Sequence, residues 1–320
     1  MEYYLVADGG GTKTEYLLFD QTGGTLAYFR TAGANATFLD RAKVMQTVRD
    51  GISGCLNRAA VSRVSGMMLF IPGFELCIDD FREDMRRPDI GLAADFWNAF
   101  YGALAMPYGI AALVGTGSFA VGVGRRGQHY IAGGWGPLFG DEGSGYHIGR
   151  LCLETVARLY DEGKGGSLLE TMLLEEMGIE EVPQLRAAAY AQEFTREKIA
   201  ALSLLTEKAA LAGDEAAQAL IARAASSLAD TVTLVYNRLE EDDLTVSLTG
   251  GVVKMGALYT APFLASLKKL APGLTYRQPR YDPLTGAALW YFSNKLGKDI
   301  EDKALADKLA QGIARLRAIG

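Results

Sequence analysis

The chain has 320 residues, of which 49% are hydrophobic and 22% charged, a length and composition typical of a globular enzyme with room for two domains. Its 32 basic and 38 acidic residues give a net charge of -6. No cluster of lysines and arginines reverses that balance locally, which argues against a nucleic-acid partner or an anionic membrane surface. Any phosphate that the protein binds must therefore be held mainly by backbone N–H groups and a metal ion.

The first hundred residues begin with apolar strands separated by tight turns, which predicts an antiparallel meander. A helix with 3.6-residue periodicity, a buried strand, a short strand and a second helix should follow. The predicted strands are Tyr3–Ala7, Glu15–Asp20, Thr25–Thr31, Gly66–Ile71 and Gly91–Ala94, and the predicted helices are Arg41–Ala60 and Phe96–Leu104.

A second meander follows this helix. The stretch from Asn98 to Gly124 is uncharged, but Pro107 and the change of pattern favour helix, turn and strands over a membrane span. Thr116 in its first turn follows Thr12 by 104 positions, so strand, Gly/Thr turn and strand recur, and we expect two similar halves. The predicted strands are Ile110–Val114, Phe119–Gly124, Gln128–Ala132, Leu244–Leu248 and Leu274–Gln278, with helices near 150–161, 167–177, 182–191, 195–211, 214–240, 285–296 and 300–318.

The N-terminal segment and the cysteines both favour a cytoplasmic protein. The chain enters a strand at Tyr3 without a basic region or a cleavage site, so no secretory leader is expected. Cys55, Cys77 and Cys152 are far apart and form no CxxC pair, which favours reduced thiols over structural zinc or disulfides.

Two glycine/threonine turns are the first candidates for ligand binding. In Asp8–Thr14 (DGGGTKT), positive φ at consecutive glycines would turn several N–H groups towards one point, as in an anion-binding nest. Asp8, at the end of a strand, is placed to hold Mg²⁺ through water. A strand follows where a Walker A loop or a dinucleotide fingerprint needs a helix. The second turn, Gly115–Ser118 (GTGS), repeats these features, and two facing hairpins could clamp a polyphosphate; the alternative is a pair of hairpins without a ligand.

Three further segments suggest the rest of a site. The glycine-rich loop 133–145 (GGWGPLFGDEGSG) combines a flat apolar face, Trp135, with the acceptor Asp141, which suits a sugar, although core packing of Trp135 and a loop cap at Asp141 are alternatives. Gly250 and Gly251 break a strand where a planar adenine could lie against the backbone, with Gly213 as the other wall. Asp95, before a helix, could take a hydroxyl proton, with helix capping as its alternative.

These motifs, in this order, resemble the phosphate-1, phosphate-2, sugar-side and adenosine motifs of the actin/hexokinase/heat-shock ATPase superfamily. The branch they resemble most is the N-acetylglucosamine kinase family, grouped with the BadF/BadG/BcrA/BcrD ATPases, over Tyr3 to about Ala288. The resemblance implies an α/β fold of two ribonuclease-H-like (actin-like ATPase) domains with a cleft between them. We expect residues 1–106 with 287–320 to form one domain and 107–286 the other. It also implies a homodimer.

The resemblance further implies a cytoplasmic transferase that uses ATP and Mg²⁺ to phosphorylate the 6-hydroxyl of a small amino sugar. Asp95 would be the catalytic base and Asp8 would hold the metal. The implied nucleotide-binding residues are Gly10, Gly11, Thr12, Lys13, Thr116, Gly117, Gly213, Gly250 and Gly251, and the implied sugar-binding residues are Asn35, Gly134, Trp135 and Asp141.

Two positions depart from the family pattern, both on the sugar side. Phe119 stands where the family often has an asparagine after GTGS, and Pro72-Gly73-Phe74 replaces a Ser/Gly-Gly turn. The acceptor therefore stays open among N-acetylglucosamine, glucosamine, N-acetylmuramic acid and glucose.

Three rival functions differ in testable features. ROK-type sugar kinases use an ExGH base motif and a cysteine zinc cluster, and the sequence has neither. Activator ATPases of the benzoyl-CoA reductase or 2-hydroxyacyl-CoA dehydratase type hold an iron–sulfur cluster through a cysteine in a glycine-rich turn, where Cys55 and Cys77 do not lie. A non-catalytic sugar-sensing regulator would normally carry a helix-turn-helix, whereas the first strand is predicted at Tyr3.

Overall fold

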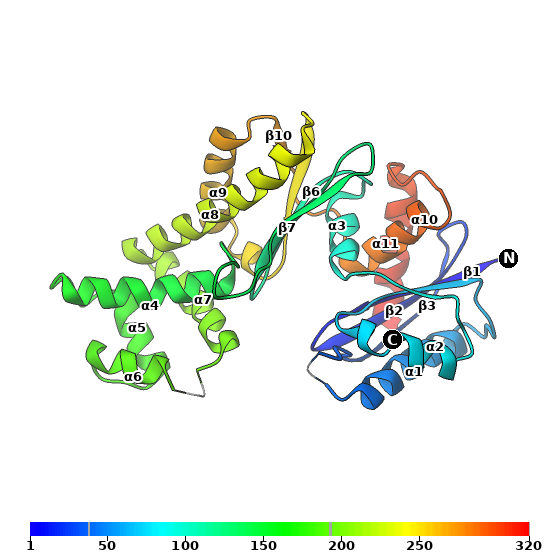
Figure 1. The fold of residues 1–320 in the computed structure, drawn as a ribbon, viewed down its shortest axis with the longest axis horizontal. Coiled ribbons are helices and arrows are strands. Elements are labelled where there is room, and N and C mark those ends of the chain that lie inside the picture. Colours follow the sequence, from blue (N-terminus) through cyan, green and yellow to red (C-terminus); the bar gives the residue numbers. More distant parts are fainter. Residues whose placement is uncertain (38, 192–193, 320) are drawn as a thin grey trace. The chain divides into compact units, whose positions relative to one another are not determined.

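The computed structural model describes residues 1–37, 39–191 and 194–319. It divides into two compact α/β units, Met1–Pro107 with Gln278–Gly320 (unit 1) and Tyr108–Arg277 (unit 2) (Figure 1). The second boundary falls at 277/278, where the sequence suggested 286/287. Helix α10 (Pro283–Asn294) belongs whole to unit 1, because it packs closely on α3 (Phe96–Leu104): a Cβ on Gly286 would lie 1.9 Å from the Asn98 carbonyl oxygen.

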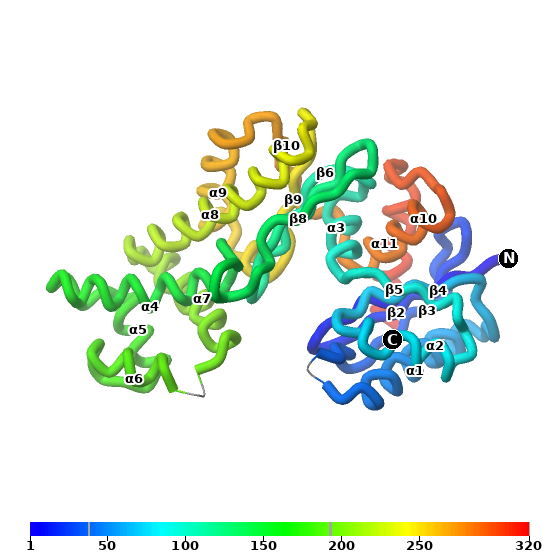
Figure 2. The backbone as a smooth tube through the Cα atoms, in the orientation of Figure 1, coloured from blue at the N-terminus to red at the C-terminus, as the bar shows by residue number. Residues whose placement is uncertain are grey.

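Unit 1 is a five-stranded sheet in the order β3-β2-β1-β4-β5, with the first three strands antiparallel and β4 and β5 parallel to β1 (Figure 2). Both faces are buried, so the strands are apolar at successive positions. Leu5 and Leu18 belong to the cluster that includes α1, whereas the rings of Tyr4 and Phe19 pack against Tyr291 of α10, Tyr4 tilted and Phe19 edge-on. The bounds are β1 Tyr3–Gly9, β2 Lys13–Asp20, β3 Thr25–Ala32, α1 Arg41–Arg58, β4 Gly66–Phe70, a 3₁₀ turn at Phe74–Leu76, α2 Ile78–Asp84, β5 Ile90–Leu92 and α11 Lys303–Ile319.

Unit 2 repeats this topology in the order β10-β9-β6-β7-β8, with β6, β7 and β8 antiparallel and β9 and β10 parallel to β6. The predicted architectural repeat is confirmed. Helix α8 lies on the sheet and α9 runs beside it (Figure 1). The bounds are β6 Gly109–Val114, β7 Ser118–Val123, β8 His129–Gly133, α4 Gly145–Asp161, α5 Leu168–Met177, α6 Leu185–Ala189, α7 Arg196–Leu211, α8 Glu215–Leu239, β9 Leu244–Thr249, a 3₁₀ turn at Val252–Met255, α9 Ala257–Leu270 and β10 Leu274–Tyr276.

One predicted helix is shorter than expected. Residues 182–191 form a 3₁₀ turn at Val182–Gln184 followed by the five-residue α6, and Pro183, which lacks a backbone N–H, lies in that turn. In the part of the chain that the structure describes, no helix has the length and apolar character needed to cross a membrane.

Candidate active site

The first glycine turn is a tight β1–β2 hairpin. The strands run into the motif from both sides, so only residues 10–12 form the turn, and the Gly10 N–H bonds to the Lys13 carbonyl at 2.9 Å. The expectation of positive φ is wrong, because Gly9, Gly10 and Gly11 all lie outside the left-handed region. The chain after β3 crosses the turn instead: a Cβ on Gly33 would lie 2.1 Å from the Gly11 carbonyl oxygen.

Asp8 lies at the carboxyl end of β1, and its Oδ1 accepts a hydrogen bond from the Asn98 side chain on α3. Burial, followed by the charges of Glu15 and Asp282, raises the pKa of Asp8 to about 7 against the opposing ammonium of Lys13. A bound cation would reverse that shift by stabilising the carboxylate. Among the described residues no three His, Cys, Asp or Glu side chains cluster as a metal site. Mg²⁺ takes one or two protein carboxylates and fills its shell with phosphates and water, so the Asp8 carboxylate is the group that could hold it.

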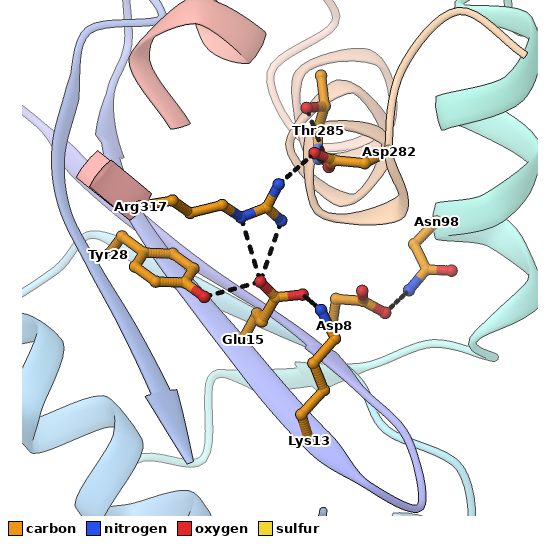
Figure 3. A network of polar contacts seen from close by, with 8 residues as sticks. All are labelled: Asp8, Lys13, Glu15, Tyr28, Asn98, Asp282, Thr285 and Arg317. Carbon is orange, nitrogen blue, oxygen red and sulfur yellow. Dashed lines mark hydrogen bonds and ion pairs between the residues drawn. The ribbon is translucent and has the colours of Figure 1, made fainter. Parts of the chain in front are cut away.

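Lys13 belongs to a polar network that links the hairpin to the last helix (Figure 3). Its ammonium pairs with buried Glu15, which also accepts from Tyr28 at 2.7 Å and pairs with Arg317 of α11 at 3.1 Å. Arg317 bonds in turn to Asp282, 2.6 Å away. Burial alone would raise the pKa of Glu15, but the hydrogen bonds from Lys13 and Tyr28 and the Arg317 charge outweigh it and hold that pKa below its usual value. The Lys13 ammonium is thus anchored beside the turn.

Helix α3 carries Asp95 at its N-terminus and Asn98 one turn later. The Asp95 side chain makes no capping hydrogen bond, so capping does not explain an aspartate at this position. Solvent reaches the carboxylate, yet partial burial, with a contribution from Glu75, raises the pKa of Asp95 against the backbone N–H groups of Asp95 and Phe96. One short helix therefore presents the Asp95 carboxylate to solvent and positions Asp8.

Asn35 lies in the segment after β3, where its Oδ1 accepts from the Thr37 N–H at 2.9 Å. This turn rests on Gly73, which has φ +75: a Cβ there would lie 2.8 Å from the Asn35 Oδ1 and 2.7 Å from the Thr37 nitrogen. The described residues offer no hydrogen-bond acceptor to the Asn35 amide nitrogen, so it remains available to a ligand.

In unit 2, the second turn is held by the start of α4. The Gly145 and Tyr146 N–H groups donate to the carbonyls of Gly115 and Thr116 at 2.8 and 3.1 Å, and the Gly115 N–H closes the turn onto Gly117 at 2.9 Å. These two N–H groups at the start of the helix are thus hydrogen-bonded to the turn and cannot donate to an anion. What remains exposed at this turn is its own backbone and the Thr116 side chain.

Asp141 is 2% exposed and is bound within unit 2. Its Oδ1 accepts from the Ser118 N–H at 3.2 Å and its Oδ2 from Arg196 on α7 at 2.7 Å. The residue has φ +63, uncommon for an aspartate. No motif in the sequence pointed to Arg196, which follows Asp141 by 55 positions.

The loop between β8 and α4 exposes large apolar side chains. Trp135 is 71% exposed, Leu138 86% and Phe139 71%, so the core-packing alternative for Trp135 is wrong. Gly134 has φ +73 and lies against Phe119: a Cβ there would be 3.3 Å from the Phe119 Cβ. The loop presents an apolar surface beside the residue that departs from the family pattern.

A pocket of about 570 Å³ opens beside the second turn of unit 2. Gly115, Thr116 and Gly251 line it, together with Leu204 and Glu207 of α7, which sequence reasoning missed. Gly213 and Gly250 do not line it. Gly250 is required by the fold instead, since it has φ +116 and a Cβ there would lie 2.3 Å from the Val114 carbonyl oxygen. The sequence carried no signal for this face of α7, because the residues that line the pocket form no apolar stripe: Glu197, Ala200, Ala201, Ser203, Leu204 and Glu207.

Four described glycines have no reason within the fold to be glycine: Gly10, Gly11, Gly115 and Gly251. None has a left-handed φ, and a Cβ would meet nothing within 4 Å, except on Gly10, where the Lys13 carbonyl oxygen lies 3.7 Å away. Glycine costs about 0.5–1 kcal/mol in backbone entropy relative to alanine within regular structure. Its presence at positions that would accept alanine indicates that something else occupies the adjoining space. All four lie in the turns predicted to hold a nucleotide.

Comparison with known proteins gives a consistent result. The profile of the BadF/BadG/BcrA/BcrD ATPase family matches residues 7–291. The chain is 26% identical to the N-acetyl-D-glucosamine kinase of Dictyostelium discoideum over 92% of this chain and 99% of that one. It is 27% identical to the N-acetylmuramic acid/N-acetylglucosamine kinase of Clostridium acetobutylicum over 79% and 86% of the two chains.

Solved structures share the fold. That of a candidate N-acetylglucosamine kinase from Chromobacterium violaceum matches with a TM-score of 0.68 at 25% identity, over 90% of this chain and 98% of that one. A ROK family glucokinase from Streptomyces griseus, in complex with glucose and AMPPNP, matches with a TM-score of 0.53 over 90% and 97% of the chains. Its 14% identity supports the fold alone.

Proposed function

The chain belongs to the BadF/BadG/BcrA/BcrD ATPase family, and we propose that it is an ATP-dependent kinase that phosphorylates the 6-hydroxyl of an amino sugar, N-acetylglucosamine first among them. The observation that carries the proposal is the set of four glycines that the fold does not require, Gly10, Gly11, Gly115 and Gly251. The kinase names of the two relatives support the choice of an amino sugar.

We assign the phosphates to the N–H groups of Gly10 and Gly11, the Thr12 hydroxyl and the second turn at Thr116 and Gly117. The adenosine would take the unit 2 pocket against Gly251, where Leu204 offers an apolar contact. Asp8 would hold Mg²⁺, which supplies positive charge against the β- and γ-phosphates. Lys13, paired with Glu15, would lie beside the phosphates as a positioned ammonium.

Asp95 would act as the general base. The sugar hydroxyl oxygen forms a bond to the γ-phosphorus, the bond from that phosphorus to the bridging oxygen breaks, and ADP leaves with the electron pair. The hydroxyl proton passes to the Asp95 carboxylate. A carboxylate whose pKa is raised accepts a proton more readily, and Asp95 is one. Asn98 would keep Asp8 in place from the same helix.

The sugar would contact Asn35, Gly134 and Trp135. The amide nitrogen of Asn35 and the exposed ring of Trp135 are both available to it. The Asp141 carboxylate already has two partners in unit 2, so a sugar contact there would have to be made beside Ser118 and Arg196.

ADP release measured with Mg²⁺, ATP and each of N-acetylglucosamine, glucosamine, N-acetylmuramic acid and glucose tests the assignment. We expect release to depend on an amino sugar. The 6-deoxy analogue of N-acetylglucosamine, which binds without offering the acceptor hydroxyl, is the matched control and should give none. ADP release that is the same with and without any sugar would refute the kinase assignment in favour of an ATPase.

The activator-ATPase alternative has less support from the structure. Cys55, Cys77 and Cys152 are all buried, and burial raises the pKa of each thiol. A cluster shared between subunits needs accessible thiolates.

A further inference from the structure

An ion pair lies directly on the second turn. Arg196 is the first residue of α7, and its Nη2 is 2.7 Å from the Asp141 Oδ2. A Cβ on Gly117 would lie 2.5 Å from that Nη2 and 2.6 Å from the Asp141 Oδ1. The guanidinium and the carboxylate therefore occupy the space that a side chain at position 117 would need.

Most donors of this guanidinium are unused. Arginine commonly binds a carboxylate through two parallel N–H groups, but here only Nη2 contacts Asp141. The Arg196 Nε is buried without an acceptor, and the described residues supply no acceptor for Nη1 either. The side chain is 39% exposed, so a ligand can reach it. Asp141 fixes the guanidinium against the turn and leaves it donors for another oxyanion.

An oxyanion at the second turn needs a positive charge that the adjoining pocket does not supply. The charged side chains that line the adjoining pocket are Glu197, Glu207 and Lys254, so an anion entering it meets more negative than positive charge. Arg196 adds a positive charge in contact with the turn. The N-terminal end of the α7 dipole, where Arg196 lies, contributes in the same direction.

We propose that Arg196 is an oxyanion-binding residue of this site, held in position by Asp141. This rests on the proposed kinase function. Two sources of the oxyanion share the same chemistry: the polyphosphate of the nucleotide, and the carboxylate of an acidic amino sugar such as N-acetylmuramic acid, whose lactyl ether carries one. In the first case Arg196 contributes to nucleotide affinity, and in the second it determines which sugar is accepted.

The test compares Arg196→Gln and Arg196→Lys with Arg126→Gln. Arg126, exposed in the β7–β8 turn at the far end of these strands, gives the same change of charge away from the site. Calorimetric titration with ATP and with adenosine, without sugar, measures the nucleotide arm. Loss of a charge-assisted hydrogen bond should weaken ATP binding about tenfold to hundredfold in Arg196→Gln and less in Arg196→Lys, with adenosine unchanged. In the sugar arm the KM for N-acetylmuramic acid should rise by that factor, while that for N-acetylglucosamine stays constant.

A double variant separates oxyanion binding from neutralisation of buried Asp141. If the only role of Arg196 is to neutralise Asp141, the Arg196→Gln change should have no effect once Asp141 is uncharged. The double variant Arg196→Gln/Asp141→Asn should then recover, and bind ATP and N-acetylmuramic acid as tightly as Asp141→Asn alone. We expect no recovery, and thermal unfolding of each variant verifies the fold. Recovery, wild-type affinities in both arms of Arg196→Gln, or a matching fall in adenosine binding would each overturn the proposal. A wild-type protein that binds no ATP would instead refute the kinase function from which it starts.

Discussion

Replacing Gly251 by alanine should weaken nucleotide binding without destabilising the protein. Gly251 has φ -64 and ψ -40, which any residue adopts, and a Cβ there would meet nothing within 4 Å. Alanine in this conformation should raise the free energy of unfolding by about 0.4–1 kcal/mol. The added methyl group would project into the pocket, and overfilling a packed site costs about 1–3 kcal/mol. ATP binding should therefore weaken about 5-fold to 150-fold.

Gly250→Ala, one residue earlier, is the matched control. Its φ of +116 and the Val114 carbonyl oxygen, 2.3 Å from the new Cβ, make alanine incompatible with the turn. Strain of this kind costs about 1–3 kcal/mol before the clash is relieved. Gly250→Ala should therefore lower the free energy of unfolding, whereas Gly251→Ala should not.

Thermal unfolding with and without Mg²⁺ and ATP measures both effects. ATP at 100 times its wild-type Kd stabilises the native protein by about 2.7 kcal/mol, and a thirtyfold weaker variant keeps only about 0.9 kcal/mol of that. Gly251→Ala should thus melt no earlier than the wild type alone and clearly earlier with ATP. If it retained the full ATP-induced shift, the unit 2 pocket would not be the nucleotide site.

Asp95→Asn should lower kcat by about 10²–10⁴ and leave ATP affinity nearly intact; near-normal turnover in a steady-state assay would make Asp95 the wrong base. The folded protein holds the Asp8 proton more tightly than the unfolded chain does. Asp8 therefore contributes stability to the nucleotide-free protein that is fully present below the ordinary pKa of 3.8 and is lost as the pH rises through its pKa of about 7. Asp8→Asn should therefore flatten this part of the stability profile in urea unfolding between pH 4 and 8, and an unchanged slope would contradict the shift. Phe119→Asn should alter the ratio of kcat/KM between N-acetylglucosamine and glucose, whereas an unchanged ratio would place the choice of acceptor elsewhere.

The parts of the fold that depend on local pattern could be predicted from the sequence. Buried strands flank each Gly/Thr turn, so the two hairpins and their repetition follow from apolar runs and glycine punctuation. The role of the glycines could not be predicted in this way. Consecutive glycines permit positive φ, but Gly10 and Gly11 do not use it in the hairpin that the Gly10–Lys13 hydrogen bond closes.

The site residues that the sequence did not reveal contact partners that lie far from them in the chain. Asn98 reaches Asp8 over 90 positions, and Arg317 reaches Glu15 over 302. Asn98 was detectable in principle, as the one polar amide in an otherwise apolar helix, three residues after Asp95. Arg317 was not, since a basic residue in the last turn of a helix is accounted for by the helix dipole alone.

The two departures from the family pattern have different structural consequences. In Pro72-Gly73-Phe74, the Phe74 ring is fully buried and packs edge-on against Phe81, with 5.2 Å between the ring centroids. This ring is therefore part of the core and presents no surface to a ligand.

Gly73 keeps the left-handed φ and the close approach that support the Asn35 turn. That departure therefore leaves the proposed sugar contact of unit 1 intact. Phe119 instead pairs with Gly133 across the strands and lies against Gly134, where the exposed loop with Trp135 begins. A large apolar ring in place of an amide changes that surface directly. We therefore infer that Phe119, and not the turn after β4, is where this chain's choice of acceptor differs from the family pattern.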